Sequence, residues 1–106
     1  MASQLGDKIK KLRKKQKLTL GKLSVKAKLS KSYLWELENG KSHSPSAEKL
    51  IAISDVFGVS INYFLDSDVR EPKEMHLDEA FFRRYKNLQP KDKEQLNKIL
   101  EIFEKE

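Results

Sequence analysis

The chain has 106 residues, a length typical of one domain with at most a small appendage. It has no cysteine, which excludes disulfides and cysteine-ligated zinc fingers, and its apolar runs are too short to cross a membrane or to direct export, so we expect a cytoplasmic protein. The formal net charge of +6 is unevenly spread: residues 1–65 carry 13 Lys and Arg against 5 Asp and Glu, and residues 66–106 carry 9 against 11. This split favours a polyanion-binding module followed by a protein-binding module.

Residues 5–14 are expected to form the first helix, because Leu5, Ile9 and Leu12 recur at a spacing that places them on one buried face. Basic side chains occupy the remaining positions, and we expect most of them to be solvated: Lys8, Lys10, Lys11, Arg13, Lys14, Lys15 and Lys17. Arg13 differs from the lysines because it lies at the border of the apolar stripe.

Residues 19–40 predict two short helices separated by roughly three residues, the spacing of a helix-turn-helix motif. Thr19 and Ser30 are suited to cap the two helix N-termini, and Asn39 with Gly40 supplies a left-handed stop. The residues expected to be buried recur at helical spacing in both segments: Leu20, Leu23, Ser24, Ala27, Tyr33, Leu34 and Leu37.

Two further helices are expected before residue 66. Pro45 and Ser44 or Ser46 begin the first of them, and Gly58 ends it. Ser60 caps the second, which is short. Their apolar faces consist of Leu50, Ile53, Val56 and Phe57, and of Ile61, Phe64 and Leu65. Residues 66–76 are polar and aperiodic, and we interpret them as a linker.

Residues 77–106 predict two more helices, with Pro90 opening the second. Isolated helices this short are marginal in water, so their apolar faces need a partner surface. Folding back on the core is one solution, but we favour a dimerisation hairpin. Its expected contact residues are Phe81, Phe82, Tyr85, Leu96, Ile99, Leu100 and Phe103.

Five of these segments, over residues 5–65, resemble the Cro/cI-like (XRE-type) helix-turn-helix family of bacterial and phage regulators. The resemblance rests on LGDKIKKLRK, on T-L-x-x-L-S-x-x-A, on SKSYLWELENG and on PSAEKLIAISDVFGVSINYFL. It implies an all-α, lambda-repressor-like DNA-binding domain of five helices over residues 1–65. The linker 66–76 and the C-terminal hairpin 77–106 would follow it.

The resemblance also implies a transcriptional repressor that binds a pseudo-palindromic double-stranded DNA operator as a homodimer. The positions at the start of a recognition helix point into the major groove, which assigns base contacts to Ser30, Lys31, Ser32 and Glu36, with the outward-facing Trp35 beside them. Phosphate contacts are assigned to Thr19, Lys22, Lys28, Asn39, Lys41 and Ser42. The family commonly pairs an arginine at the position of Arg13 with the acidic residue at Glu38.

Two positions depart from the family pattern. Leu20 stands where many members have glutamine, so the phosphate contact of that glutamine is absent. Lys28 stands where the turn usually has glycine, so a lysine is expected near the left-handed conformation.

Other functions remain open at this point. The chain could be an antitoxin-like or antirepressor module that binds another protein through its C-terminal segment, or a restriction-modification controller. No constellation of residues indicates an enzyme, a cofactor or a metal. His43 and His76 are expected to be ordinary surface residues.

Overall fold

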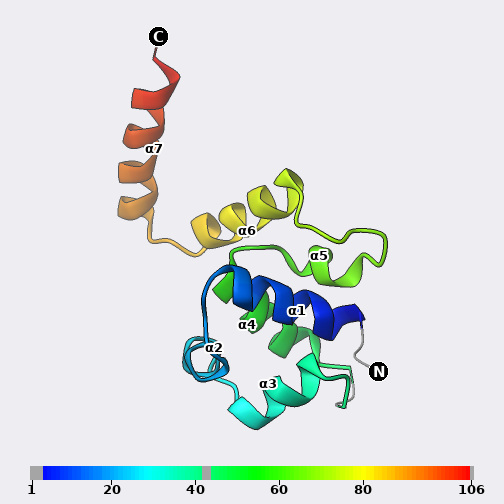
Figure 1. Cartoon of the computed structure of the whole chain (residues 1–106). Helices are drawn as coiled ribbons and strands as arrows, with labels where there is room; N and C mark the ends of the chain where they lie inside the picture. Colours follow the sequence, from blue (N-terminus) through cyan, green and yellow to red (C-terminus); the bar gives the residue numbers. More distant parts are fainter. Residues whose placement is uncertain (1–3, 42–43, 106) are drawn as a thin grey trace.

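The computed structural model describes residues 4–41 and 44–105, and this part of the chain contains helices and no strand (Figure 1). The all-α prediction is thereby confirmed. The helices are α1 Gln4–Lys15, α2 Leu20–Ala27, α3 Lys31–Glu38, α4 Ala47–Phe57, α5 Ile61–Leu65, α6 Glu74–Lys86 and α7 Pro90–Glu104.

The first five helices enclose one hydrophobic core. Its buried members come from every one of these helices and from two positions outside them: Ile9, Leu12, Leu23, Ala27, Leu34, Leu37, Leu50, Ile53, Phe57, Val59, Tyr63, Phe64 and Val69. The helical spacing predicted most of this set. Leu65 is an exception, since 65% of its surface is exposed although the sequence pattern placed it on the apolar face of α5.

Local capping signals fix where the helices begin and end. The Thr19 hydroxyl accepts a hydrogen bond from the backbone N–H of Lys22 at 3.0 Å, and Ser30 and Ser46 cap α3 and α4 in the same way. Gly40 and Gly58 follow α3 and α4 with φ values of +68° and +72°, a left-handed conformation that suits glycine. These ends hold α2 and α3 at the spacing that the sequence predicted.

Gly6 allows α1 to cross the end of α3 at very short range. A Cβ atom at this position would lie 2.3 Å from the carbonyl oxygen of Leu37 and 2.8 Å from that of Glu38. Both obstacles are backbone atoms, so a side chain here would push the two helices apart.

The expectation that Lys8 is a solvated lysine is wrong. Only 5% of its surface is exposed, and its Nζ donates to the carbonyl oxygens of Tyr63 and Asp66, both at 2.6 Å. The ammonium also lies 4.6 Å from the centre of the Tyr63 ring. The last carbonyls of a helix lack hydrogen-bond donors within the helix, and the Lys8 ammonium is the donor for these carbonyls at the end of α5. Burial lowers the pKa of Lys8, and the nearby negative charge of Asp66 opposes this shift.

The stretch between α5 and α6 lies against the core. Val69 is buried, the Tyr63 hydroxyl donates to the carbonyl of Arg70 at 2.9 Å, and the Gln4 side chain donates to the carbonyl of Ser67 at 2.7 Å. The last three residues of the predicted linker, 74–76, already belong to α6.

His76 is also a correction, because it is fully buried and not on the surface. Its Nδ1 accepts from the backbone N–H of Lys73 at 2.9 Å, and its ring lies 5.6 Å from that of Tyr63 in an edge-on arrangement. The His76 carbonyl accepts from the backbone N–H of Ser60 at 3.0 Å. The first turn of α6 is therefore part of the core.

Side chains further along α6 hold it against α4 and α5. The Glu79 carboxylate accepts from the Ser60 hydroxyl at 3.0 Å and from the Asn62 amide at 2.9 Å. Arg83 forms an ion pair with Asp55 of α4 at 3.7 Å. Together with the buried Ala80, these contacts place successive turns of α6 against α4 and α5.

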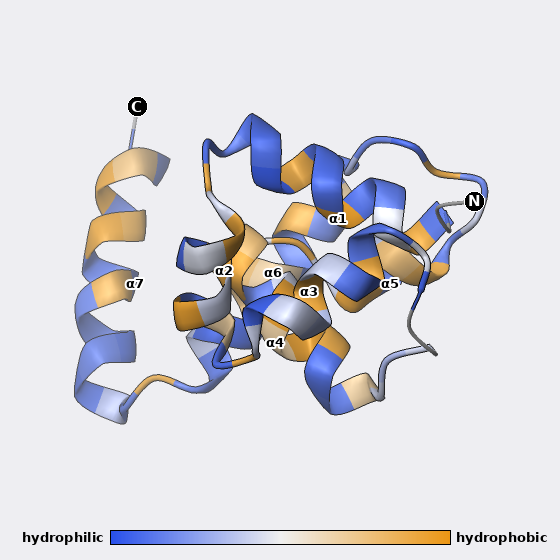
Figure 2. Ribbon diagram, turned by 60° about the horizontal axis from the view of Figure 1, so that its bottom comes forward, coloured by the Kyte–Doolittle hydropathy of each residue, from blue (hydrophilic) through white to orange (hydrophobic). Residues whose placement is uncertain are grey.

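Helix α7 leaves this body. It has no buried residue, and the chain turns at the start of α7 so that the helix projects away from α1–α5 (Figure 1). The molecule accordingly measures 51 × 28 × 24 Å along its principal axes. Apolar residues recur in the half of α7 toward the C-terminus, while its first turns are hydrophilic (Figure 2). None of the helices in the described ranges is long and apolar enough to span a bilayer.

Candidate nucleic-acid interface

Helices α2 and α3 are joined by a tight turn in which Lys28 adopts φ +58° and ψ +41°. The backbone N–H of Leu29 donates to the carbonyl of Ser24 at 3.1 Å, which closes the end of α2. The left-handed conformation predicted for Lys28 is thus present, at a cost of about 1 kcal/mol relative to glycine. The lysine side chain is exposed to solvent.

The outer face of α3 carries the residues predicted to contact bases. Leu34 and Leu37 bury the opposite face in the core. Seen from the side that brings α3 forward, the helix lies in front of the core (Figure 2). Four exposed residues of α3, together with the half-buried Leu20 of α2, line one open hollow, which we term the α2–α3 hollow: Leu20, Lys31, Ser32, Trp35 and Glu36. Ser30 precedes it as the N-cap of α3.

Most of the residues assigned to phosphate contacts are exposed around this hollow. Thr19, Lys22, Lys28 and Lys41 are exposed. Asn39 is half-buried, and its side-chain amide donates to the Trp35 carbonyl at 2.8 Å, which closes the end of α3. Ser42 and His43 lie outside the described residues.

The electrostatics of this surface favour an anion. Neither α2 nor α3 has an acidic residue in its first turn, so the positive ends of both helix dipoles are uncompensated there. Lysines lie on α2, on the turn and on α3: Lys22, Lys26, Lys28 and Lys31. Glu36 is the acidic residue that lines the hollow itself.

The ion pair expected between Arg13 and Glu38 is formed. Arg13 Nε donates to Glu38 Oε2 at 2.7 Å, Nη2 donates to Oε1 at 3.0 Å, and Nη1 donates to the Leu18 carbonyl at 2.9 Å. The Glu38 side chain is 2% exposed. This bidentate contact ties the last turn of α3 to α1 and so restrains the orientation of the exposed face.

Tyr33 supports α3 from the other side. It packs against the core, as the sequence predicted, and the Lys49 ammonium lies 4.6 Å from its ring centre. Burial raises the pKa of the Tyr33 hydroxyl. Tyr33 therefore braces α3 from the core side and does not belong to its exposed face.

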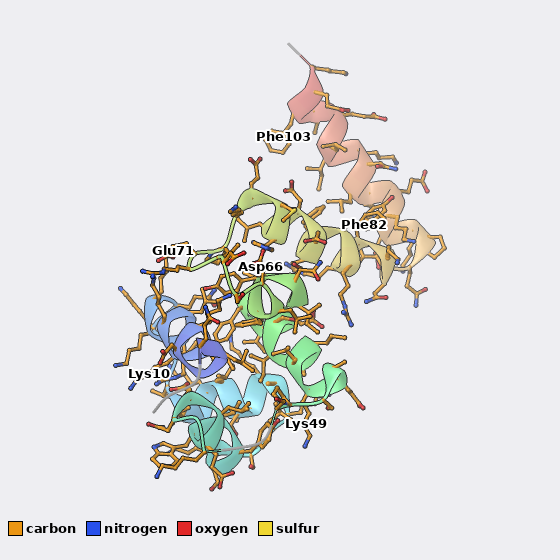
Figure 3. The ribbon with its side chains drawn as sticks, turned by 90° about the vertical axis from the view of Figure 1, so that its right-hand side faces the viewer. Lys10, Lys49, Asp66, Glu71, Phe82 and Phe103 are labelled. Carbon is orange, nitrogen blue, oxygen red and sulfur yellow. The ribbon has the colours of Figure 1, made fainter. Side chains whose placement is uncertain are left out.

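The residues predicted for dimerisation lie together in a second feature, an apolar cleft between α6 and α7 of about 380 Å³, which we term the α6–α7 cleft. All seven predicted residues line it, joined by Asn97, which the apolar pattern could not indicate: Phe81, Phe82, Tyr85, Leu96, Asn97, Ile99, Leu100 and Phe103. Figure 3 shows Phe82 and Phe103 on the two C-terminal helices, far from Lys49 of α4. Within the described residues, no group of three or more acidic or histidine side chains is placed to hold a metal.

A family model for helix-turn-helix proteins (HTH_3) matches residues 9–64, which is more than half of the chain. The chain belongs to this helix-turn-helix family. It is 38% identical over 58 residues to the immunity repressor protein of Bacillus phage phi105 and 37% identical over 62 residues to the transcriptional regulator SinR of Bacillus subtilis. The match spans only 40% and 56% of those two relatives.

Solved structures of helix-turn-helix family members show the same fold. A crystal structure of SinR with DNA superposes with a TM-score of 0.57 at 37% identity, covering 58% of this chain and 98% of that one. A SinR–SinI complex superposes with a TM-score of 0.59 at 24% identity, covering 94% of this chain and 97% of that one. At that identity the second likeness concerns the fold alone, and it extends over the C-terminal helices.

Proposed function

We propose that the chain is a sequence-specific DNA-binding transcriptional regulator that acts as a repressor, with α3 in the major groove. The observation that carries this proposal is the α2–α3 hollow, where Lys31, Ser32, Trp35 and Glu36 meet on an exposed face flanked by lysines. Two relatives support it by name, a phage immunity repressor and SinR, and SinR has been crystallised with DNA.

The chemistry of each position suggests its role. Lys31 can donate to guanine O6 and N7, and Glu36 can accept from the exocyclic amine of cytosine. The hydroxyls of Ser30 and Ser32 can serve either base. The phosphate contacts assigned to Thr19, Lys22, Lys28, Asn39, Lys41 and Ser42 would fix the register of α3 without reading sequence.

We further propose that two copies associate through the α6–α7 cleft, so that residues 1–65 bind DNA and residues 77–106 dimerise. One recognition helix contacts only a few base pairs, and paired half-sites about 34 Å apart, or a multiple of this distance, supply the missing specificity. Burying four of the seven apolar cleft residues would contribute about 6 to 12 kcal/mol before the costs of association.

Selection of bound sequences from random DNA, followed by binding of variants, tests the DNA-binding proposal. Lys31→Ala and Glu36→Gln should change the preferred base at one position per half-site by about 1 to 3 kcal/mol, because both side chains would face the bases in the proposed complex. Lys41→Ala is the matched variant of a phosphate-contacting position. It should weaken binding to all sequences alike and reduce the slope of log K against log salt concentration by about one. Equal losses on every sequence for all three variants would show that α3 does not read bases.

A second function is favoured by the α6–α7 cleft itself. Its apolar lining is open, and it would serve equally to bind a different protein, as in an antirepressor-type partner. Sedimentation of the purified chain separates the two, since a monomer at tens of micromolar would leave the cleft available to another protein.

A further inference from the structure

The α2–α3 hollow has an apolar side that the polar base contacts do not use. Leu20 of α2 and Trp35 of α3 both line it, and 46% of the Trp35 surface is exposed. Lys31, Ser32 and Glu36 form the rest of the lining. A large indole open to solvent beside a leucine, in a lining that is otherwise polar or charged, is the kind of apolar patch that marks an interaction site.

The Leu20 side chain and the backbone that carries Trp35 are held in place before any ligand binds. Leu20 packs against the hydrophobic core. The Trp35 carbonyl accepts from the Asn39 backbone N–H at 3.0 Å and from the Asn39 side-chain amide at 2.8 Å, which fixes the turn of α3 that carries the indole. The Arg13–Glu38 ion pair holds the next turn. The leucine wall and the backbone of the hollow are therefore preformed, so little backbone entropy is lost on binding.

Among the four bases of duplex DNA, only thymine shows an apolar group in the major groove, its 5-methyl. We infer that the α2–α3 hollow takes the 5-methyl group of a thymine in each half-site, with Leu20 and Trp35 as its walls. The inference rests on the DNA-binding function proposed above and names the base that this hollow selects.

The polar part of the lining fits the same base. Thymine carries the acceptor O4 next to its methyl, and the Ser32 hydroxyl can donate to it, which leaves Lys31 for the guanine assigned to it above. The Glu36 carboxylate repels O4, so the thymine should enter with its methyl toward Leu20 and Trp35 and its O4 toward Ser32, while Glu36 accepts from a cytosine of a neighbouring base pair. Cytosine offers neither the methyl nor an acceptor at this position.

Removing the methyl alone tests the inference, and it leaves the protein unchanged. Full-length chain is bound to its selected operator, and each thymine is replaced in turn by deoxyuridine. One thymine per half-site should respond, with the dissociation constant rising about fourfold per half-site, because burying a methyl-sized group is worth about 0.8 kcal/mol. Specific binding with no response at any thymine would overturn the inference while leaving the DNA-binding function intact.

A protein variant then locates the methyl. With Trp35→Ala, the operators with thymine and with deoxyuridine at the responding position should bind equally well. Leu65→Ala is the matched control, since it removes an apolar side chain that is 65% exposed on α5, and it should keep the full deoxyuridine effect. An undiminished effect in Trp35→Ala would place the methyl elsewhere.

The 5-methyl group also occurs on methylated cytosine, and one more binding measurement, with modified DNA, distinguishes the two bases. A gain in affinity when 5-methylcytosine replaces a cytosine of the site, with no response at any thymine, would overturn the assignment to thymine. If selection enriches no sequence at all, the DNA-binding proposal fails, and this inference fails with it.

Discussion

Arg13 and Glu38 form a two-pronged ion pair between α1 and α3, in which both carboxylate oxygens of a side chain that is 2% exposed accept from one guanidinium. Taking two charges out of water is costly, so such a pair stabilises a fold little compared with apolar residues. Loss of one partner is destabilising, because it leaves the other charge buried and unpaired. Its main effect is to fix the direction of α3.

Arg13→Met should therefore lower the free energy of unfolding by about 3 kcal/mol, because Glu38 would be left buried and unpaired. Arg13→Met combined with Glu38→Leu should cost much less than the sum of the single changes. Urea unfolding of the four proteins measures this coupling. Additive costs would mean that the pair does not act as a unit.

Gly6→Ala should destabilise the protein by about 1 to 3 kcal/mol, because the new methyl meets the α3 backbone and forces α1 away. Gly21→Ala is the matched control. Only the Thr19 hydroxyl lies near its Cβ position, at 3.8 Å, and alanine favours helix over glycine by up to about 1 kcal/mol. Thermal unfolding should show a lower midpoint for the first variant and an unchanged or higher one for the second.

Phe103→Glu should weaken self-association by about thirtyfold or more, the usual effect of losing a central apolar contact at an interface. Ile102→Glu is the control on the neighbouring residue: Ile102 is also exposed, at 68%, but does not line the α6–α7 cleft. Sedimentation equilibrium compares them. Point variants serve better than truncation at residue 68, because Val69 and His76 beyond it belong to the core. Equal effects of both variants would exclude the cleft as the interface.

Tyr63→Phe should alter stability in alkaline solution. Burial, and then the negative charge of Glu71, raises the pKa of Tyr63 above its usual value of 10.0, so above that pH the unfolded chain releases this proton more readily than the folded one. The associated stability is fully present below pH 10.0 and is lost as pH rises through the folded pKa.

Guanidinium unfolding between pH 8 and 11 should accordingly show a shallower decline for Tyr63→Phe than for the original chain. At neutral pH the variant should lose about 1 kcal/mol with the hydrogen bond to the Arg70 carbonyl. Parallel declines over the whole range would show that Tyr63 does not titrate differently in the two states.

Local signals predicted the helical part of this fold well. Thr19, Ser30, Gly40 and Gly58 each act within three or four residues of their own position, so their effects can be deduced from neighbouring sequence. The left-handed conformation of Lys28 was expected from the family resemblance, because the family usually has glycine at this position of the turn. The four α3 residues that line the α2–α3 hollow were predicted because the exposed side of a helix follows from its register, whereas Leu20 was expected to be buried and was not predicted to line it.

The buried residues that the sequence did not predict share a different cause. Lys8, Val69 and His76 are buried by tertiary contacts that no periodicity of the sequence encodes. Lys8 donates to the carbonyl of Tyr63, 55 residues further along the chain, and the His76 ring packs against the ring of Tyr63. A lysine in a basic run and a histidine in a polar stretch carry no local mark of burial. Both became core residues only because the carbonyl end of α5 and the start of α6 meet there.

The anchoring of α6 by Glu79 to Ser60 and Asn62 has a consequence for any assembly of two chains. With α6 held rigidly to the core, the turn at residues 87–89 is where the direction of α7 is decided relative to α3. In a symmetric pair of chains, the conformation of that three-residue turn would determine the distance between the two copies of α3. A change of one residue in its length would re-rotate α7 and select a different operator spacing, with every base contact left as it was.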